Sequence, residues 1–178
     1  MILLLSISGC KSQETELQRG MDLRDKLMLA SFSFSADITA DFGQYFYDFS
    51  LSCTAYPAGH MLFEVTGPES IAGISGKLTA DNGYLQFDDT ALSFPLLAEG
   101  ELSPVSAPWI LVNTLRAGYL VSVGDEGEQY RLTYHDTYAA ESLQVDVWVN
   151  RNNIPVRAEF FWKGTLVLSL VINDFTFL

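Results

Sequence analysis

Basic residues are scarce in this chain. Ten Lys and Arg stand against 22 Asp and Glu in 178 residues, which gives a net charge of −12 at pH 7. Such a surface repels phosphate backbones, so the composition argues against nucleic acid as a partner. It is also repelled by anionic lipid headgroups, and any membrane attachment therefore has to come from something other than a basic patch.

Histidine and cysteine are nearly absent, with two of each. His60 and His135 have no second ligand-type residue at zinc spacing, and His135-Asp136 is typical of a turn, so neither a catalytic zinc nor a serine triad is supported. The glycine segment 67–73 lacks the lysine and the helix of a phosphate loop. We therefore expect no catalytic residue, no resident metal and no cofactor, in a protein that binds something and does not transform it.

Long apolar runs are also missing, because no stretch after Cys10 approaches the about 20 residues of a spanning helix. The chain opens instead with "MILLLSISGC", a short apolar run followed by two small residues and Cys10. This opening resembles the bacterial lipobox, which implies cleavage before Cys10 and acylation of its thiol and new amino group. We expect a truncated signal peptide at 1–9, without its basic front, a lipidated Cys10 with a polar tether at 10–15, and one domain at 16–178. The alternative is a partly apolar terminus that contains a cysteine by chance.

Cys53 lies inside an alternating apolar run. If Cys10 is acylated, Cys53 has no intramolecular partner and is expected to be a small buried hydrophobe. The alternative is a disulfide between Cys10 and Cys53.

Helical spacing follows the tether over residues 12–30. The apolar stripe of this helix is expected to pack on a sheet, because its polar face is mixed in sign; lying on a membrane is the alternative. The residues of the stripe are Leu17, Met21, Leu23, Leu27 and Met28.

From residue 32 onward, apolar and polar residues alternate with a period of two, which is typical of strands with one buried face. Pro108 interrupts the alternation and fits the first turn of a helix that ends at Gly118, while 95–104 is expected to be a loop. On the polar side of the first hairpin, Asp37, Asp41 and Asp48 indicate a solvated face, with calcium as the alternative. Eleven strands are expected, at 32–42, 45–55, 61–66, 72–80, 84–87, 90–94, 119–123, 129–135, 142–150, 156–162 and 165–178.

Aromatic residues make up 13% of the chain and lie mainly on these strands. Phe46, Tyr56, Trp148 and Phe161 fall on the faces opposite the main apolar rows of their strands. Two short helices can cover only part of such a sheet. The sheet therefore either curls around the helices so that side chains fill its interior, or it leaves a hydrophobic hollow.

The order of elements, from lipobox to tether, helix, long strands, a helix near Pro108 and closing strands, resembles the LolA/LolB superfamily of bacterial lipoprotein carriers, which includes RseB-type regulators and LppX-type lipoproteins. The resemblance implies a mainly β (α+β) fold, a curved antiparallel half-barrel with an N-terminal helix and a mid-chain plug helix over a hydrophobic cavity. "APWILVNTLRAG" at 107–118 is similar to the plug helix, and Arg116 and Arg131 are the candidates for the cavity arginine of LolA. The segment 61–87 is similar to part of LolB, which implies that Ile71 contacts a membrane.

These observations predict an extracytoplasmic, membrane-anchored lipoprotein that holds an acyl chain, a lipid or a lipoprotein moiety in its half-barrel. The alternative is a filled, RseB-like module that contacts another envelope protein. The candidate cavity residues lie on the apolar rows or on the plug helix; they are Phe34, Tyr47, Phe49, Phe63, Leu111, Leu115, Val147, Phe160 and Leu168.

Overall fold

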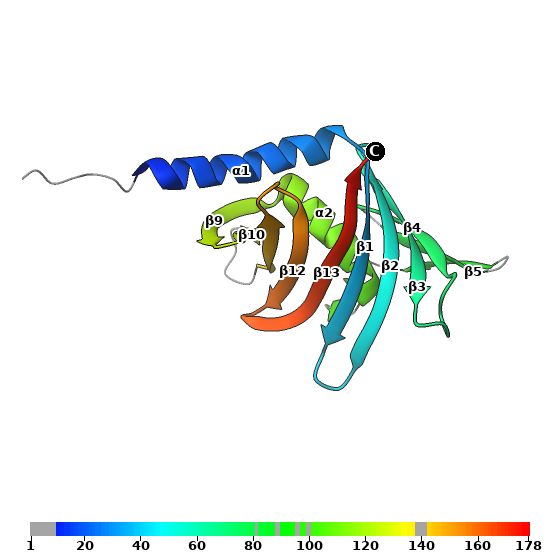
Figure 1. Ribbon diagram of the computed structural model, residues 1–178. Helices are drawn as coiled ribbons and strands as arrows, with labels where there is room; N and C mark the ends of the chain where they lie inside the picture. The colour runs from blue at the N-terminus through cyan, green and yellow to red at the C-terminus, as the bar shows by residue number, and fades with distance from the viewer. Residues whose placement is uncertain (1–9, 81, 88–89, 95–96, 99–100, 138–141) are drawn as a thin grey trace, which may run out of the picture.

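One open antiparallel sheet of eleven strands dominates the computed structural model (Figure 1). The structure describes residues 10–80, 82–87, 90–94, 97–98, 101–137 and 142–178, so the expected signal segment 1–9 lies outside the described residues. The strand order is β6-β5-β4-β3-β2-β1-β13-β12-β11-β10-β9. The bounds are β1 (Phe32–Asp41), β2 (Phe46–Tyr56), β3 (His60–Gly67), β4 (Ser75–Thr79), β5 (Gly83–Phe87), β6 (Thr90–Phe94), β9 (Tyr119–Glu126), β10 (Gln129–His135), β11 (Gln144–Asn150), β12 (Pro155–Trp162) and β13 (Thr165–Phe177).

The period-two pattern sets the two faces of this sheet. Phe34 of β1 lies opposite Cys53 of β2, which lies opposite Phe63 of β3, and all three side chains are buried. On the other side of β1, Ala40 lies opposite Leu168 of β13. We call the face that carries these side chains the inner face and the opposite one the outer face. The mainly β half-barrel expected from the sequence is confirmed.

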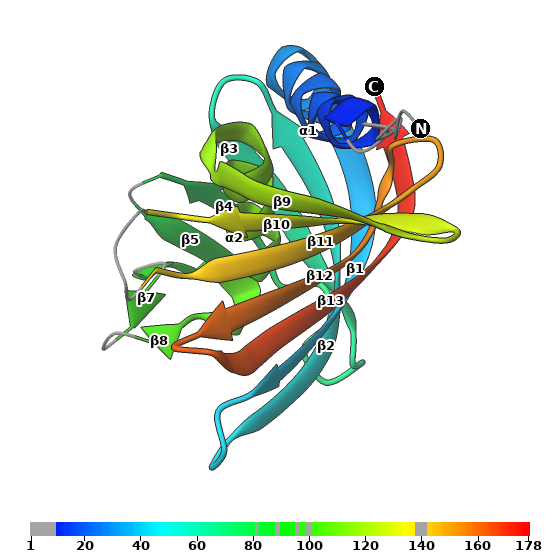
Figure 2. The same ribbon diagram turned by 90° about the vertical axis from the view of Figure 1, so that its left-hand side faces the viewer.

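The inner face is covered by α2 (Ala107–Ala117), and Figure 2 shows the two halves of the curved sheet on either side of this helix. Pro108 occupies its first turn, where a missing N–H costs nothing. Leu111, Val112 and Leu115 are buried in the same apolar cluster as the inner face. A three-residue 3₁₀ helix, Pro104–Ser106, leads into α2.

α1 (Cys10–Leu29) lies along the rim of the sheet and packs against α2 and against β9, an edge strand of the sheet on which it is expected to pack. Leu23 and Leu27 are fully buried, and Gly20 lies so close to β9 that a Cβ there would meet Leu120 Cδ2 at 2.5 Å. The expected stripe is only partly correct, because Leu17, Met21 and Met28 are exposed. A helix at the rim of a sheet contacts its neighbours along one narrow face only. The apolar residues of α1 occupy two faces of the helix, so the residues of one face stay exposed.

Two further details differ from the sequence expectations. The segment expected as a loop at 95–104 contains the short hairpin of β7 (Leu97–Ala98) and β8 (Glu101–Leu102), whose two-residue strands are too short to show alternation. β4 begins at Ser75 and not at residue 72, because the chain turns first at Gly73, which has a φ of 87°.

Cys53 is a free thiol on the inner face, so the alternative of a disulfide with Cys10 is wrong. Burial raises the pKa of this thiol far above its usual range, which keeps it neutral and unreactive. Its expected role as a small buried hydrophobe is confirmed.

Gly76 makes room for the ring of Phe63 on the inner face. A Cβ at Gly76 would lie 2.6 Å from the Phe63 ring and collide with the backbone oxygen of Tyr84. We expect Gly76→Ala to lower the free energy of unfolding by about 1–3 kcal/mol in urea denaturation, because the backbone and the ring must both shift. The control is Gly124→Ala, since a Cβ at Gly124 meets nothing within 4 Å. Equal stabilities of the two variants would contradict this packing.

Candidate ligand-binding face

The structure brings most of the candidate cavity residues together beneath α2. Leu168 lies opposite Phe160 of β12, and Val147 of β11 lies opposite Ala158, so these side chains continue the inner face that begins with Phe34 and Phe63. Seven candidates are buried in one apolar cluster: Phe34, Phe63, Leu111, Leu115, Val147, Phe160 and Leu168.

Tyr47 and Phe49 lie toward the end of the inner face where β1 connects to β2. They pair with Ala40 and Ile38 of β1, so they share the inner face. Phe49 is half-buried, whereas 44% of the Tyr47 surface is exposed. The two candidates therefore mark where the apolar face reaches solvent.

An aromatic cluster closes the opposite end, near the end of α1. The Phe32 and Phe175 rings stack with centroids 5.1 Å apart, and the Phe34 ring lies 5.9 Å from the Phe175 ring. Phe177 adds an edge contact 5.4 Å from Phe175. Sequence reasoning did not single out this cluster, although the alternating Phe residues at both ends of the chain carry the signal for it.

Arg116 of α2 is the one of the two candidate arginines that points into the interior. Its Nε donates to the carbonyl of Leu27, 2.9 Å away, and its Nη1 donates to the carbonyl of Tyr56, 3.0 Å away. The guanidinium lies 5.4 Å from the centre of the Phe32 ring, and only 9% of the residue is exposed. Burial lowers the pKa of Arg116 from its ordinary value.

Arg24 of α1 makes the matching contact in the other direction. Its Nε donates to the carbonyl of Leu115, 3.2 Å away, and its Nη2 donates to the carbonyl of Gly118. The carbonyls of Leu27 and Leu115 belong to the last turns of α1 and α2, where no intrahelical partner exists and the helix dipole is negative. Each helix therefore supplies the arginine that caps the other, an arrangement that we call the arginine clasp.

Three buried polar atoms on the segment that leads into and through α2 have no hydrogen-bond partner among the described residues. They are Ser106 Oγ, Trp109 Nε1 and Arg116 Nη2, and their spacing of three and seven residues places them on one side of the helix. Tyr134 of β10 has a buried hydroxyl with no partner in the same part of the chain, and burial raises its pKa to about 12. Such atoms are rare in folded proteins.

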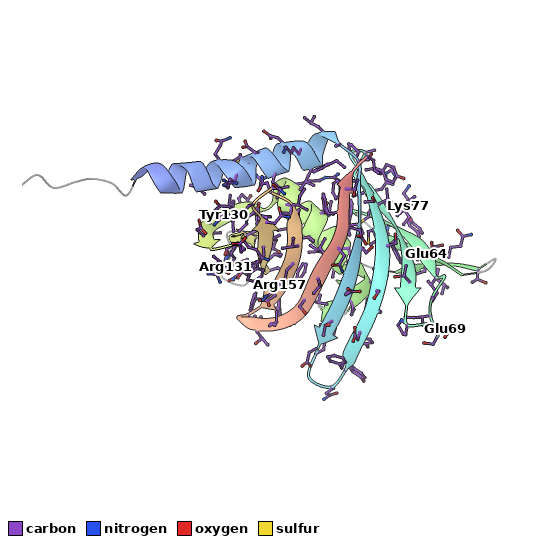
Figure 3. All side chains as sticks on the ribbon, viewed as in Figure 1. Glu64, Glu69, Lys77, Tyr130, Arg131 and Arg157 are labelled. Atoms are coloured by element: carbon purple, nitrogen blue, oxygen red, sulfur yellow. The ribbon has the colours of Figure 1, made fainter. Side chains whose placement is uncertain are left out.

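Arg131 lies on the outer face, within a network of charged and aromatic side chains. Its Nε is 3.1 Å from Glu126, and the indole nitrogen of Trp148 donates to the same carboxylate at 2.8 Å. Arg157 covers the Trp148 ring at 4.1 Å. Figure 3 labels Arg131 of β10 and Arg157 of β12 in this part of the sheet. This network covers part of the outer face and is separate from the face beneath α2.

The remaining candidates are dispersed. His60 stacks on Tyr56 at 4.7 Å in one half of the sheet, while His135 lies 2.7 Å from Ser142 Oγ in the other half. Within the described ranges, no three His, Cys, Asp or Glu residues are grouped so that they could hold a metal ion.

The acidic candidates and Ile71 lie on the surface. Asp37 accepts hydrogen bonds from Ser50 and Asn173 on the outer face, which accords with a solvated strand face. Ile71 lies in the loop between β3 and β4 and is 38% exposed.

No family model matches the sequence, and no curated protein is similar to it by sequence. Solved structures are similar in fold. An uncharacterised conserved protein from Thermus thermophilus matches with a TM-score of 0.53 and 12% identity, over 91% of this chain and 87% of that one. LprF from Mycobacterium bovis matches with a TM-score of 0.50 and 11% identity, over 91% and 93%. A LolA superfamily protein from Nitrosomonas europaea gives a TM-score of 0.47 and 14% identity, over 88% and 92%.

The arginine clasp can be tested by removing one guanidinium. We expect Arg116→Met to lower the free energy of unfolding by about 2 kcal/mol, because the carbonyls of Leu27 and Tyr56 lose their buried donor. We also expect faster hydrogen exchange of the α2 amides than in the unchanged protein. The control is Arg151→Met, which removes an exposed ion pair with Asp125 and is expected to cost at most about 1 kcal/mol. The clasp is refuted if both variants behave alike.

Proposed function

From the LolA/LolB-like fold of the chain, we propose that the protein is an extracytoplasmic lipoprotein that binds an acyl chain between the inner face of the sheet and α2. The acyl chain belongs to a lipid or to the lipid moiety of another lipoprotein. Binding is non-catalytic and consists of burial alone, at about 0.8 kcal/mol for each CH₂ group removed from water.

The observation that carries this proposal is that a single short helix covers the apolar inner face of the sheet. An apolar surface that spans β1 to β3 and β10 to β13 is covered by α2, an 11-residue helix. α2 in turn is held at its C-terminal end through arginine-to-carbonyl hydrogen bonds with α1 and β2. A chain that enters beneath α2 therefore has to replace both these bonds and the apolar contacts of Leu111, Val112 and Leu115, which its own apolar surface can supply.

Three unpartnered polar atoms along α2 provide hydrogen-bonding groups for a ligand. Trp109 Nε1 and Arg116 Nη2 are donors, and Ser106 Oγ both donates and accepts. They suit the ester or carboxylate oxygens at the head of an acyl chain.

Membrane attachment through an acylated Cys10 is part of the same proposal. α1 begins at Cys10, so the residues expected as a tether, 10–15, are its first turns, and their role as a tether stays a proposal. None of the described helices combines the length and the apolar character that crossing a bilayer requires. Contact of Ile71 with a membrane likewise stays a proposal.

Native mass spectrometry tests for the ligand. The domain from Lys11 onward, made in bacteria and purified without detergent, is expected to carry a lipid or fatty acid that organic extraction recovers. If the mass is that of the apoprotein and a fluorescent fatty acid is not taken up afterwards, ligand binding is refuted. That result would favour the alternative, a filled half-barrel that contacts another envelope protein.

A pair of matched substitutions locates the ligand. Val147 is fully buried on the inner face, whereas Val171 is 51% exposed on the outer face of β13. We expect Val147→Phe to weaken uptake of a fluorescent fatty acid about tenfold or more, because the added ring occupies the space beneath α2. Val171→Phe should leave uptake unchanged. Circular dichroism confirms that both variants are folded, and equal affinities would place the ligand elsewhere.

Lipidation is tested on protein extracted from the membranes of the cells that encode it. The expected mass is that of the chain from Cys10 onward with a diacylglycerol and a further acyl chain attached. Cys10→Ser is expected to remove these additions and to release the protein from the membrane fraction. An unmodified Cys10 in the membrane-extracted protein contradicts the anchor.

A further inference from the structure

The connection between β1 and β2 ends in a group of aromatic side chains, most of them exposed. We call Phe42, Tyr45, Phe46 and Tyr47 the aromatic tip. Tyr45 and Phe46 are 62% and 65% exposed, and Tyr47 is 44% exposed. By contrast, the inner-face aromatic side chains of the same sheet, such as Phe34, are almost fully buried. Large aromatic side chains that face solvent as a group mark a contact surface.

Most of the tip lies beyond the last residues of β1 and β2 that pair with a third strand among the described residues. β13 pairs with β1 only as far as Ala40, and β3 begins to pair with β2 at Ser50. Residues 41–46 therefore project as a two-stranded hairpin from the end of the sheet opposite α1 (Figure 1), whereas Tyr47 pairs with Ala40 and still has β13 beyond it. A hairpin of two strands is marginally stable in water, so exposing aromatic side chains there gains nothing for the fold.

The turn holds the aromatic side chains in a fixed arrangement. The Gly43 amide donates to Asp41 Oδ1 at 2.8 Å, and the Phe42 amide donates to the Tyr45 carbonyl at 3.0 Å. Gly43 has a φ of 79°, which favours glycine. The Phe42 and Tyr47 rings meet edge to face, 6.3 Å apart. A preorganised tip loses little conformational entropy when it docks.

The charge around the tip is of one sign. Asp37, Asp41 and Asp48 are exposed on the same hairpin, and no Lys or Arg occurs between residues 37 and 50. Aromatic anchors surrounded by charged groups are the composition of a protein-binding hot spot with its rim. We propose that the aromatic tip docks into an apolar pocket of a second protein, and that Lys and Arg residues border this pocket.

A bilayer fits these residues less well. Aromatic residues are common at membrane interfaces. The tip, however, cannot enter such an interface without carrying Asp41 and Asp48 toward the headgroups. Anionic lipids would repel both carboxylates, and the chain as a whole has a net charge of −12. The ten residues of β1, at about 3.3 Å each, also separate the tip from the C-terminal end of α1 by about 33 Å.

The proposal for the aromatic tip does not depend on whether a ligand binds beneath α2.

Photo-cross-linking in the cells that encode the protein identifies the partner. Benzoylphenylalanine replaces Phe46 in the full chain, and a second version carries it at Val171, which is exposed on the outer face away from the tip. The expected result is a protein adduct at position 46 that is absent at 171, with the cross-linked peptide of the partner in a basic-rimmed apolar pocket. Adducts with lipid alone, the same adducts at both positions, or no adduct at position 46 would overturn the proposal.

Binding of the purified partner gives the quantitative test. Phe46→Ser and Tyr45→Ser are each expected to raise the Kd about tenfold or more, while Val171→Ser leaves it unchanged. Raising the salt from about 0.05 M to about 0.5 M is expected to weaken binding, because the acidic residues face a basic rim. Thermal unfolding confirms that the variants remain folded. A Kd insensitive to both tip substitutions overturns the proposal, as does flotation with phosphatidylcholine vesicles that Phe46→Ser abolishes.

Discussion

The arginine clasp is the constraint on which the cover of the sheet depends. Arg24 and Arg116 each leave their own helix and donate to the last carbonyls of the other, so the two helix ends satisfy one another. Arg116 also reaches the carbonyl of Tyr56 at the end of β2, which ties α2 to the sheet. Neither guanidinium forms an ion pair within the described ranges. Both donate instead to backbone carbonyls at the negative ends of helix dipoles, and these carbonyls stabilise the positive charge where little of it is exposed to water. α2 is thus fixed at its C-terminal end by hydrogen bonds to carbonyls and along its length by its buried apolar side chains.

The two ends of the inner face differ in how far their aromatic side chains are exposed to solvent. Near α1, stacked rings around Phe32 and Phe175 fill the space between the strand ends. At the other end the apolar row continues to Phe49 and Tyr47, which are partly open to solvent. Trp109 and Arg116 of α2 carry donors that lack partners among the described residues, and Arg116 lies beside the Phe32 ring of the aromatic cluster.

The sequence predicts the strands well, because each depends on a local alternation that Phe34 to Ala40 or Val145 to Val149 display without help from the rest of the chain. It predicts the surface of α1 poorly, since Leu17, Met21, Leu23, Leu27 and Met28 fit two faces and only the position of β9 decides between them. The partners of Arg24 and Arg116 lie about ninety residues away in the chain, so helix-end capping of this kind has no local signature. Tyr47 follows the same alternation as buried residues, and its exposure depends on where β3 stops pairing with β2, which no local pattern records.

β1 lies at the centre of the sheet, between β2 and β13, and Phe32 at its start pairs with Phe177 near the end of the last strand. During synthesis, β1 to β6 can form a meander as they leave the ribosome, but one edge of β1 stays unpaired until β13 has been made. For that interval the chain exposes an apolar row and a free strand edge together, the combination that invites aggregation. The long-range pairing that completes the sheet thus makes the nascent chain dependent on rapid synthesis or on a chaperone that shields β1.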